Sequence, residues 1–281
     1  MQTLTFAAVN FDPNFGHITE NLNRMESWVR KLAAQGAQVI GFPEMSVCRY
    51  DRSKAILPHL QRLPGPVTDR LVAMAAEYQV SILAGLATRD QQGKRYLSQV
   101  AASPEGISAL YHKIHLGPTE KALFTAGRDI ALASCRGWQI GLQLCYDTHF
   151  PELSTLLALR GADVLFCGFA SPRESPEAKC DRLERYLAAR AYDNSCYLIS
   201  CNLMGRGGSG KVFPGGALAF SPKGDLIAKA CELEKNYLLV DLDPTPLERI
   251  RSSKMGYFLP NRQPTLYKGL IDDNYQKTKN N

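Results

Sequence analysis

Apolar and polar residues alternate along the chain with the periods of strands and helices. Leu4–Val9 is a short apolar run of the kind that forms a buried strand, and Val39–Phe42 is a second. Between them, apolar residues recur at helical spacing from Ile18 to Ala34, at Leu22, Met25, Trp28, Val29 and Leu32. The chain therefore opens with a predicted strand, helix and strand.

The same alternation continues through most of the chain. Further helices are predicted at 67–78, 151–160 and 178–192, and further strands at 81–87, 99–102, 107–111, 138–144, 164–169, 197–200, 217–220, 226–230 and 237–240. No linker, low-complexity run or internal repeat divides them, so we expect one α/β domain over residues 1–270. Residues 271–281 are polar and aperiodic, and we expect a tail that frays or lies on a partner subunit.

The composition is that of an ordinary globular protein. Of 281 residues, 45% are hydrophobic and 21% are charged, which provides enough apolar material for a large core. The net charge of +6 is interspersed with acidic residues, so a nucleic-acid partner is not indicated. The first ten residues lack the pattern of a signal peptide, and no apolar run reaches about 18 residues. We therefore expect a cytoplasmic protein that does not bind a membrane.

Eight cysteines are present, at positions 48, 135, 145, 167, 180, 196, 201 and 231, without any Cys-x-x-Cys spacing. A chain of this length needs no disulfide framework to hold its core. Most of these cysteines are therefore expected to be reduced core residues.

Three predicted strands are each followed by a side chain with reactive chemistry. Glu44 follows Gly41-Phe-Pro, Lys113 follows Tyr111-His, and Cys145 ends the run Leu142-Gln-Leu. Strand ends are where α/β sheets usually present their sites. Each residue alone is more often a surface charge or a core cysteine, but together the three form a candidate site.

In this order, the three segments resemble the nitrilase superfamily of carbon–nitrogen hydrolases, whose sites combine Glu, Lys and Cys from successive strands. The resemblance runs from the first strand to about Tyr267 and includes the sequence segments 145–152, 189–194 and 213–216. No step of the expected hydrolysis requires a cofactor or metal, and the resemblance implies a single-domain, four-layer α–β–β–α sandwich. It also implies a second glutamate, which Glu120 matches, and at least a homodimer in which the segment 255–260 reaches over the partner.

These residue types suit hydrolysis through a covalent thioester. A free thiol is mostly protonated at neutral pH, so Cys145 needs a base within hydrogen-bonding reach. Glu44 can be that base if burial and the negative charge of Glu120 raise its pKa against the effect of Lys113. Lys113 and a backbone N–H, for which the resemblance nominates Tyr146, would stabilise the negative oxygen that forms as sulfur attacks.

The resemblance also narrows the substrate. Tyr146-Asp147 after the cysteine is similar to the amidase and carbamoylase branches, whereas nitrile-cleaving members typically carry Trp-Glu. A small amide or N-carbamoyl compound is therefore favoured over a nitrile. Tyr50, Phe169 and Arg173 are expected in the substrate pocket, where Arg173 would either bind a substrate carboxylate or pair with a neighbouring glutamate.

Other assignments are possible for some of these residues. His149 could be the base for Cys145, as in papain-like enzymes, but this would leave Glu44 and Lys113 unexplained. Gly205–Val212 nearly matches a phosphate-binding loop, but Val212 replaces the required hydroxyl residue, so a glycine-rich hairpin loop is favoured.

Four further residues have expected partners. His112 and His115 flank Lys113 and are assigned to packing and hydrogen bonding in preference to metal binding. Asp147 and Arg190 are expected to form an ion pair that supports the nucleophile's turn, as the resemblance implies.

Two alternative functions remain open. They are acyl transfer to an amine through the same thioester, and a non-catalytic scaffold with the same fold.

Overall fold

In the computed structural model, which describes residues 1–172, 174–206, 210–232 and 236–267, the side chains of strand β1 (Leu4–Val9) enter two separate cores. Leu4, Phe6 and Ala8 belong to one core, and Ala7 and Val9 belong to the other. Successive side chains of a strand point to opposite faces of the sheet. Both faces of the sheet that contains β1 are therefore buried.

Six strands form this first sheet, in the order β14-β1-β2-β3-β4-β5. Strands β1, β2 and β3 are parallel, and the remaining pairs are antiparallel. Helices α1 (Ile18–Ala33) and α2 (Pro66–Tyr78) cover its outer face with buried residues such as Met25 and Met74. The other strands are β2 (Val39–Gly41), β3 (Ser81–Arg89), β4 (Arg95–Ser103), β5 (Gly106–His112) and β14 (Tyr237–Leu242).

The second sheet also has six strands, in the order β13-β12-β9-β8-β7-β6. Its central strands β7, β8 and β9 are parallel. Helices α3 (Pro151–Leu159) and α4 (Pro176–Asn194) lie against it, and Leu157 and Leu183 are fully buried in the contact. The strands are β6 (Leu132–Cys135), β7 (Trp138–Leu144), β8 (Val164–Phe169), β9 (Tyr197–Asn202), β12 (Ala217–Phe220) and β13 (Leu226–Ala230).

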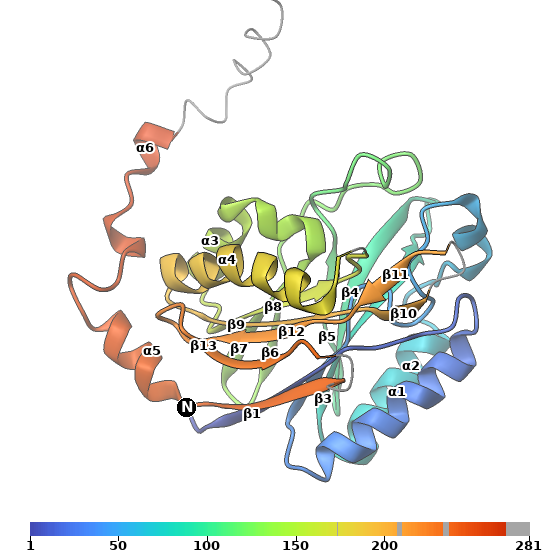
Figure 1. The fold of residues 1–281 in the computed structure, drawn as a ribbon, viewed down its shortest axis with the longest axis horizontal. Helices are drawn as coiled ribbons and strands as arrows, with labels where there is room; N and C mark the ends of the chain where they lie inside the picture. The colour runs from blue at the N-terminus through green and yellow to red at the C-terminus, as the bar shows by residue number, and fades with distance from the viewer. Residues whose placement is uncertain (173, 207–209, 233–235, 268–281) are drawn as a thin grey trace, which may run out of the picture.

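The inner faces of the two sheets pack against each other. The rings of Phe6 on β1 and Phe166 on β8 are stacked with their centroids 5.8 Å apart. A Cβ atom at Gly41 would lie 2.3 Å from the Phe166 ring, so a glycine is needed at this close approach. Helices α1 and α2 lie on one side of the double sheet, and α3 and α4 lie on the other (Figure 1). The expected four-layer α–β–β–α sandwich is confirmed.

Most predicted helices and strands are present, and the missed elements are short. They are β6, β10 (Met204–Arg206), β11 (Val212–Pro214), α5 (Pro244–Arg251), α6 (Pro264–Tyr267) and the 3₁₀ helices η1 (Lys54–His59), η2 (Cys145–His149) and η3 (Leu259–Asn261). Strands of three or four residues show too little periodicity to be recognised. Strands β10 and β11 flank the glycine-rich segment and pair antiparallel, which agrees with the hairpin favoured over a phosphate-binding loop. Residues 207–209 between them lie outside the described residues.

Two of the eight cysteines are not reduced, although most cysteines were expected to be reduced core residues. Cys180 on α4 and Cys231, which follows β13, form a disulfide. The other six are free, and four of these are fully buried, which agrees with their assignment to the core.

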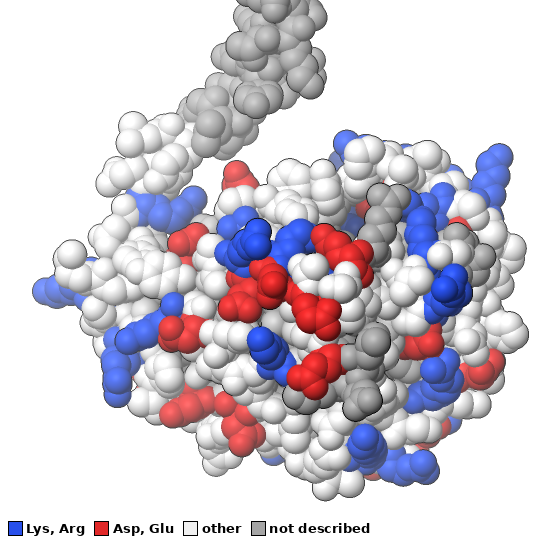
Figure 2. All heavy atoms as spheres, in the orientation of Figure 1, with Lys and Arg blue, Asp and Glu red and all other residues white. Residues whose placement is uncertain are grey.

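The outer surface carries charges of both signs. On the face shown in Figure 2, Lys and Arg side chains are interspersed with Asp and Glu, as the sequence indicated. The segment after α5 extends away from the sandwich and leaves Met255 86% exposed (Figure 1). Among the described helices, none combines the length and apolar character needed to cross a membrane. The predicted polar tail lies outside the described residues.

Candidate active site

The carboxyl ends of three strands bring the predicted reactive residues to one edge of the sandwich. Glu44 follows β2 after a two-residue extension, and Lys113 comes directly after β5 in the same sheet. Cys145 comes directly after β7 in the opposite sheet. The candidate site therefore lies where the two sheets meet.

Lys113 lies between two carboxylates. Its Nζ donates to Glu44 Oε1 at 2.8 Å and to Glu120 Oε1 at 3.0 Å, and all three side chains are at most 5% exposed. Burial by itself lowers the pKa of Lys113, but the negative charges of Glu44 and Glu120 raise it above its usual value. The lysine is therefore a fixed ammonium group.

Glu120 is held by three donors. Besides Lys113, the Tyr50 hydroxyl donates to Oε1 at 2.5 Å, and the N–H of Gly117 donates to Oε2 at 2.7 Å. Burial and the charge of Glu120 raise the pKa of Tyr50 well above its usual value, so its hydroxyl stays protonated. Tyr50, which was predicted to contact substrate, thus has its hydroxyl committed to orienting Glu120.

Glu44 keeps one carboxylate oxygen free. Oε2 is buried and has no hydrogen-bond partner among the described residues, while Oε1 is bound by Lys113. Burial raises the pKa of Glu44 to about 7, with Lys113 opposing the rise and Glu120 adding to it. A carboxylate with this pKa can both accept and return a proton near neutral pH.

Two glycines let the backbone at Glu44 fit between the sheets. A Cβ at Gly168 on β8 would lie 2.8 Å from the Glu44 nitrogen, and one at Gly85 on β3 would lie 2.4 Å from the oxygen of Pro43. Neither contact leaves room for a side chain. The two sheets therefore set the position of Glu44 through direct backbone contact.

Cys145 occupies a sharp turn. It has φ of 35°, a region that non-glycine residues rarely adopt, and it begins the 3₁₀ helix η2. The Thr148 hydroxyl donates to the Cys145 carbonyl oxygen at 2.7 Å and stabilises the turn. Burial and the charge of Glu44 raise the pKa of Cys145 to about 12, against the lowering effect of Lys113 and of the Ala170 backbone N–H. The side chain is therefore a thiol that needs a base.

The predicted ion pair between Asp147 and Arg190 is wrong. Asp147 is fully buried, and its carboxylate accepts from the Tyr111 hydroxyl, the Leu144 N–H and two donors of His115. Arg190 instead donates from Nε to the Thr148 carbonyl oxygen at 3.1 Å. These four donors, three of them from residues that flank Lys113, already occupy both carboxylate oxygens, so neither oxygen pairs with the arginine.

The remaining predicted binding residues have different positions. Tyr146 is 37% exposed and contacts Phe150 edge-on, and its ring lines a cavity of about 500 Å³ that also includes His115 and Phe124. Phe169 is 1% exposed and belongs to the hydrophobic core that includes β8, so its side chain offers no open surface to a substrate. Arg173 lies outside the described residues.

The histidines make contacts unlike those of a catalytic base or a metal site. His149 packs against Tyr146 and Tyr186, at ring-centroid distances of 5.5 and 5.0 Å, and makes no hydrogen bond with Cys145 in the described structure. His112 stacks on Tyr96 with centroids 4.2 Å apart. Within the described ranges, no group of three His, Cys, Asp or Glu side chains could hold a metal ion.

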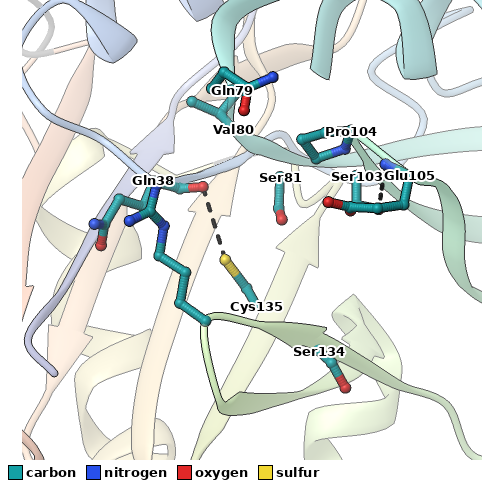
Figure 3. Close-up of a pocket in the computed structure, with 10 residues that line it drawn as sticks. Gln38, Gln79, Val80, Ser81, Ser103, Pro104, Glu105, Ser134 and Cys135 are labelled. Atoms are coloured by element: carbon teal, nitrogen blue, oxygen red, sulfur yellow. Dashed lines mark hydrogen bonds between the residues drawn. The ribbon is translucent and has the colours of Figure 1, made fainter. Parts of the chain in front are cut away.

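A cavity of about 160 Å³ lies at the opposite ends of the strands (Figure 3). Its lining includes Gln38 just before β2, Ser81 at the start of β3 and Cys135 at the end of β6. The Cys135 sulfur points to the Gln38 carbonyl oxygen at 4.0 Å. Glu44 and Cys145 follow the other ends of their strands, so this cavity is separate from the candidate site.

Comparison with known proteins agrees with this arrangement. The family model described as carbon-nitrogen hydrolase matches residues 5–252. The chain belongs to the carbon–nitrogen hydrolase family. The predicted resemblance to the nitrilase superfamily is thereby confirmed.

Three proteins illustrate what this carbon–nitrogen hydrolase is similar to. An (R)-stereoselective amidase of a Pseudomonas species is 29% identical over 242 residues, covering 86% of this chain and 85% of the amidase. A nitrilase of Pyrococcus abyssi is 28% identical over 267 residues, covering 93% and 98%. The crystal structure of an amidase from Nesterenkonia sp. superposes with a TM-score of 0.80 at 25% identity, covering 95% and 96%.

Proposed function

We propose that this carbon–nitrogen hydrolase cleaves the C–N bond of a small amide or N-carbamoyl compound through a thioester on Cys145. The observation that supports this most directly is the state of Glu44. It has a pKa of about 7, one unpartnered buried oxygen, and a hydrogen bond to the Lys113 ammonium. A base of this pKa is matched to activating a thiol near neutral pH.

In the first step, Glu44 takes the proton of the Cys145 thiol as the sulfur attacks the carbonyl carbon. The C–S bond forms, and the carbonyl electron pair moves to the oxygen. The Lys113 ammonium and the Tyr146 backbone N–H stabilise that negative charge, an effect typically worth about 3 kcal/mol for each donor. The tetrahedral intermediate then expels the nitrogen, which receives the proton from Glu44, and ammonia or an amine leaves.

The second step regenerates the thiol. Glu44 again acts as base and removes a proton from water, whose oxygen attacks the thioester carbonyl. The C–S bond breaks, and the sulfur regains a proton through Glu44. Glu120, which is bound to Lys113, keeps the ammonium in place and raises the pKa of Glu44 in both steps.

The preference for an amide or N-carbamoyl substrate is supported by Tyr146-Asp147 after the nucleophile and by the similarity to an amidase. The similarity to a nitrilase keeps nitrile hydrolysis as an alternative, and acyl transfer to an amine would use the same thioester. We further propose that the substrate's distal group binds near Tyr50 and Arg173, and that Arg173 binds a carboxylate where one is present.

Ammonia release from a panel of amides, N-carbamoyl compounds and nitriles tests this function. Cys145→Ala should abolish turnover without lowering the melting temperature, and unchanged turnover would exclude this nucleophile. His149→Ala should keep most of the activity, because His149 makes no hydrogen bond with Cys145. Product analysis with and without an added amine separates hydrolysis from acyl transfer.

We also propose that the protein is at least a homodimer. Leu156 and Leu159 on α3 and Tyr192 on α4 are 50, 47 and 48% exposed, and Tyr192 contacts Phe258 of the extended C-terminal segment. Exposed apolar side chains on two neighbouring helices are typical of an interface. A monodisperse monomer at micromolar concentration in light scattering would contradict the proposal. The cytoplasmic location stays a prediction.

A further inference from the structure

Asp147 connects the segment that carries Cys145 with the segment that carries Lys113. Its Oδ2 accepts from the N–H of Leu144, the residue before the nucleophile, at 3.0 Å. The same oxygen accepts from the hydroxyl of Tyr111, two residues before Lys113, at 2.7 Å. One buried carboxylate thus spans the two sheets at the candidate site.

The other oxygen binds the residue on the far side of Lys113. Oδ1 accepts from the backbone N–H of His115 at 2.8 Å and pairs with its Nδ1 at 2.9 Å. A carboxylate can only accept hydrogen bonds, so Nδ1 carries the proton. Tyr111 and His115 lie two residues before and after Lys113, so Asp147 holds both flanks of the lysine.

The His115 ring is fixed on a second side. It stacks on Phe150 with centroids 3.9 Å apart and an interplanar angle of 10°. Phe150 ends the turn that starts at Cys145, and its N–H donates to the Asp147 carbonyl oxygen at 3.0 Å. The histidine side chain therefore contacts the nucleophile's turn both through Asp147 and through Phe150.

We propose that His115 is a positioning residue whose Nδ1–H bond to Asp147 holds the Lys113 ammonium in register with the Cys145 sulfur. This inference rests on the proposed function, in which both groups must act on one carbonyl. Without the Nδ1 donor, the segment after Lys113 is held to Asp147 by the backbone N–H of His115 alone. Small displacements of groups that act together cost rate steeply.

Three variants test the proposal. His115→Phe keeps a ring to stack on Phe150 but removes the donor, and we expect kcat for amide hydrolysis to fall about 10- to 100-fold. His115→Asn returns an N–H donor near the position of Nδ1 and should recover most of that loss. His112→Phe is the matched control, because His112 flanks Lys113 on the other side but bonds to Ser98 Oγ at 2.8 Å and not to Asp147. The kcat of His112→Phe should stay within about threefold of that of the unchanged protein, which is a much smaller change than a misplaced catalytic group would cause.

A second measurement separates positioning from general destabilisation and does not require turnover. The rate at which iodoacetamide alkylates Cys145, followed by mass spectrometry of its peptide, should rise with pH as Glu44 loses its proton. The Lys113 ammonium lowers the pKa of Glu44, so a displaced lysine should move this midpoint upward by about half a unit or more. A merely structural role would change the melting temperature and leave the midpoint in place.

The outcomes distinguish the two proposals. If the unchanged protein hydrolyses no substrate, the proposed function fails, and the alkylation midpoint of His115→Phe still decides the role of His115. If the unchanged protein is active and His115→Phe matches it in kcat and midpoint, the role of His115 is overturned alone. A fall in kcat accompanied by a lower melting temperature and an unchanged midpoint would also overturn it.

Discussion

The Lys113 ammonium donates to the Glu44 carboxylate at 2.8 Å, and both side chains are only 1% exposed. This pair joins the two charges that the proposed chemistry needs, the base and the oxyanion donor. The lysine lowers the pKa of the glutamate while burial raises it, so that the two effects leave Glu44 titrating at about 7.

Replacing the ammonium should reduce activity by two effects at once. Lys113→Met removes an oxyanion donor and the charge that lowers the pKa of Glu44, so more of the base is protonated at pH 7. We expect kcat to fall about 100-fold or more. Steady-state ammonia release measures this loss. Lys121→Met, at an exposed position in the same loop, is the control and should change kcat little.

The pH dependence should report Glu44. Activity requires its unprotonated form, so kcat/KM should rise with pH through a midpoint near 7 and then level off, since the pKa of Cys145 is raised to about 12. The charge of Glu120 raises the pKa of Glu44, so Glu120→Gln should move this midpoint to lower pH. A midpoint near 4.5 in the unchanged protein would contradict the assignment of Glu44 as a buried base.

A single methyl group should displace the base. Gly168→Ala places a Cβ 2.8 Å from the Glu44 backbone nitrogen, so the loop after β2 must shift. We expect kcat to fall about tenfold or more, because the reacting groups lose their alignment. Gly141→Ala in the same sheet is the control, since the atoms nearest to its Cβ would be side-chain atoms of Leu157, at 3.1 Å and beyond. Equal activities of the two variants would show that the contact does not position Glu44.

The disulfide should contribute to stability. Cys180 and Cys231 are 51 residues apart in sequence, and closing a loop of this length in the unfolded chain is worth about 4 kcal/mol in the chain-entropy account. Cys231→Ser should therefore lower the free energy of unfolding by roughly that amount. Urea unfolding without reductant measures the difference. With a dithiol reductant present, the variant and the unchanged protein should become similar, and a difference that persisted would point to packing at this position.

The sequence predicted the longer helices and strands, but it did not predict the contacts between elements. The periods of apolar residues located α1, α2, β1 and β7, because burial of one face leaves a pattern within each segment. Strands β10 and β11 have three residues each and form through pairing with each other, which leaves no such pattern. For the same reason, no local signal showed that Gly168 would lie against Glu44.

The partner of Asp147 illustrates the same limit. The sequence indicated that a charge so close to the nucleophile needs a partner, but it suggested Arg190. In the folded chain, the carboxylate faces the end of β5, where Tyr111 and His115 supply three donors. Which donors reach a buried acceptor depends on how the two sheets are stacked.

The sequence by itself therefore determined the α/β class and the candidate residues Glu44, Lys113 and Cys145, because strand periodicity and reactive residues at strand ends are local features, while the resemblance to the nitrilase superfamily added Glu120. Only the tertiary structure decided that Lys113 lies between two carboxylates, that one oxygen of Glu44 stays free, and that His115 is joined to Asp147. The contacts of Lys113 join segments that follow β2 and β5 of one sheet, and the contact between His115 and Asp147 joins the two sheets. Their distances exist only once the strands and sheets have assembled.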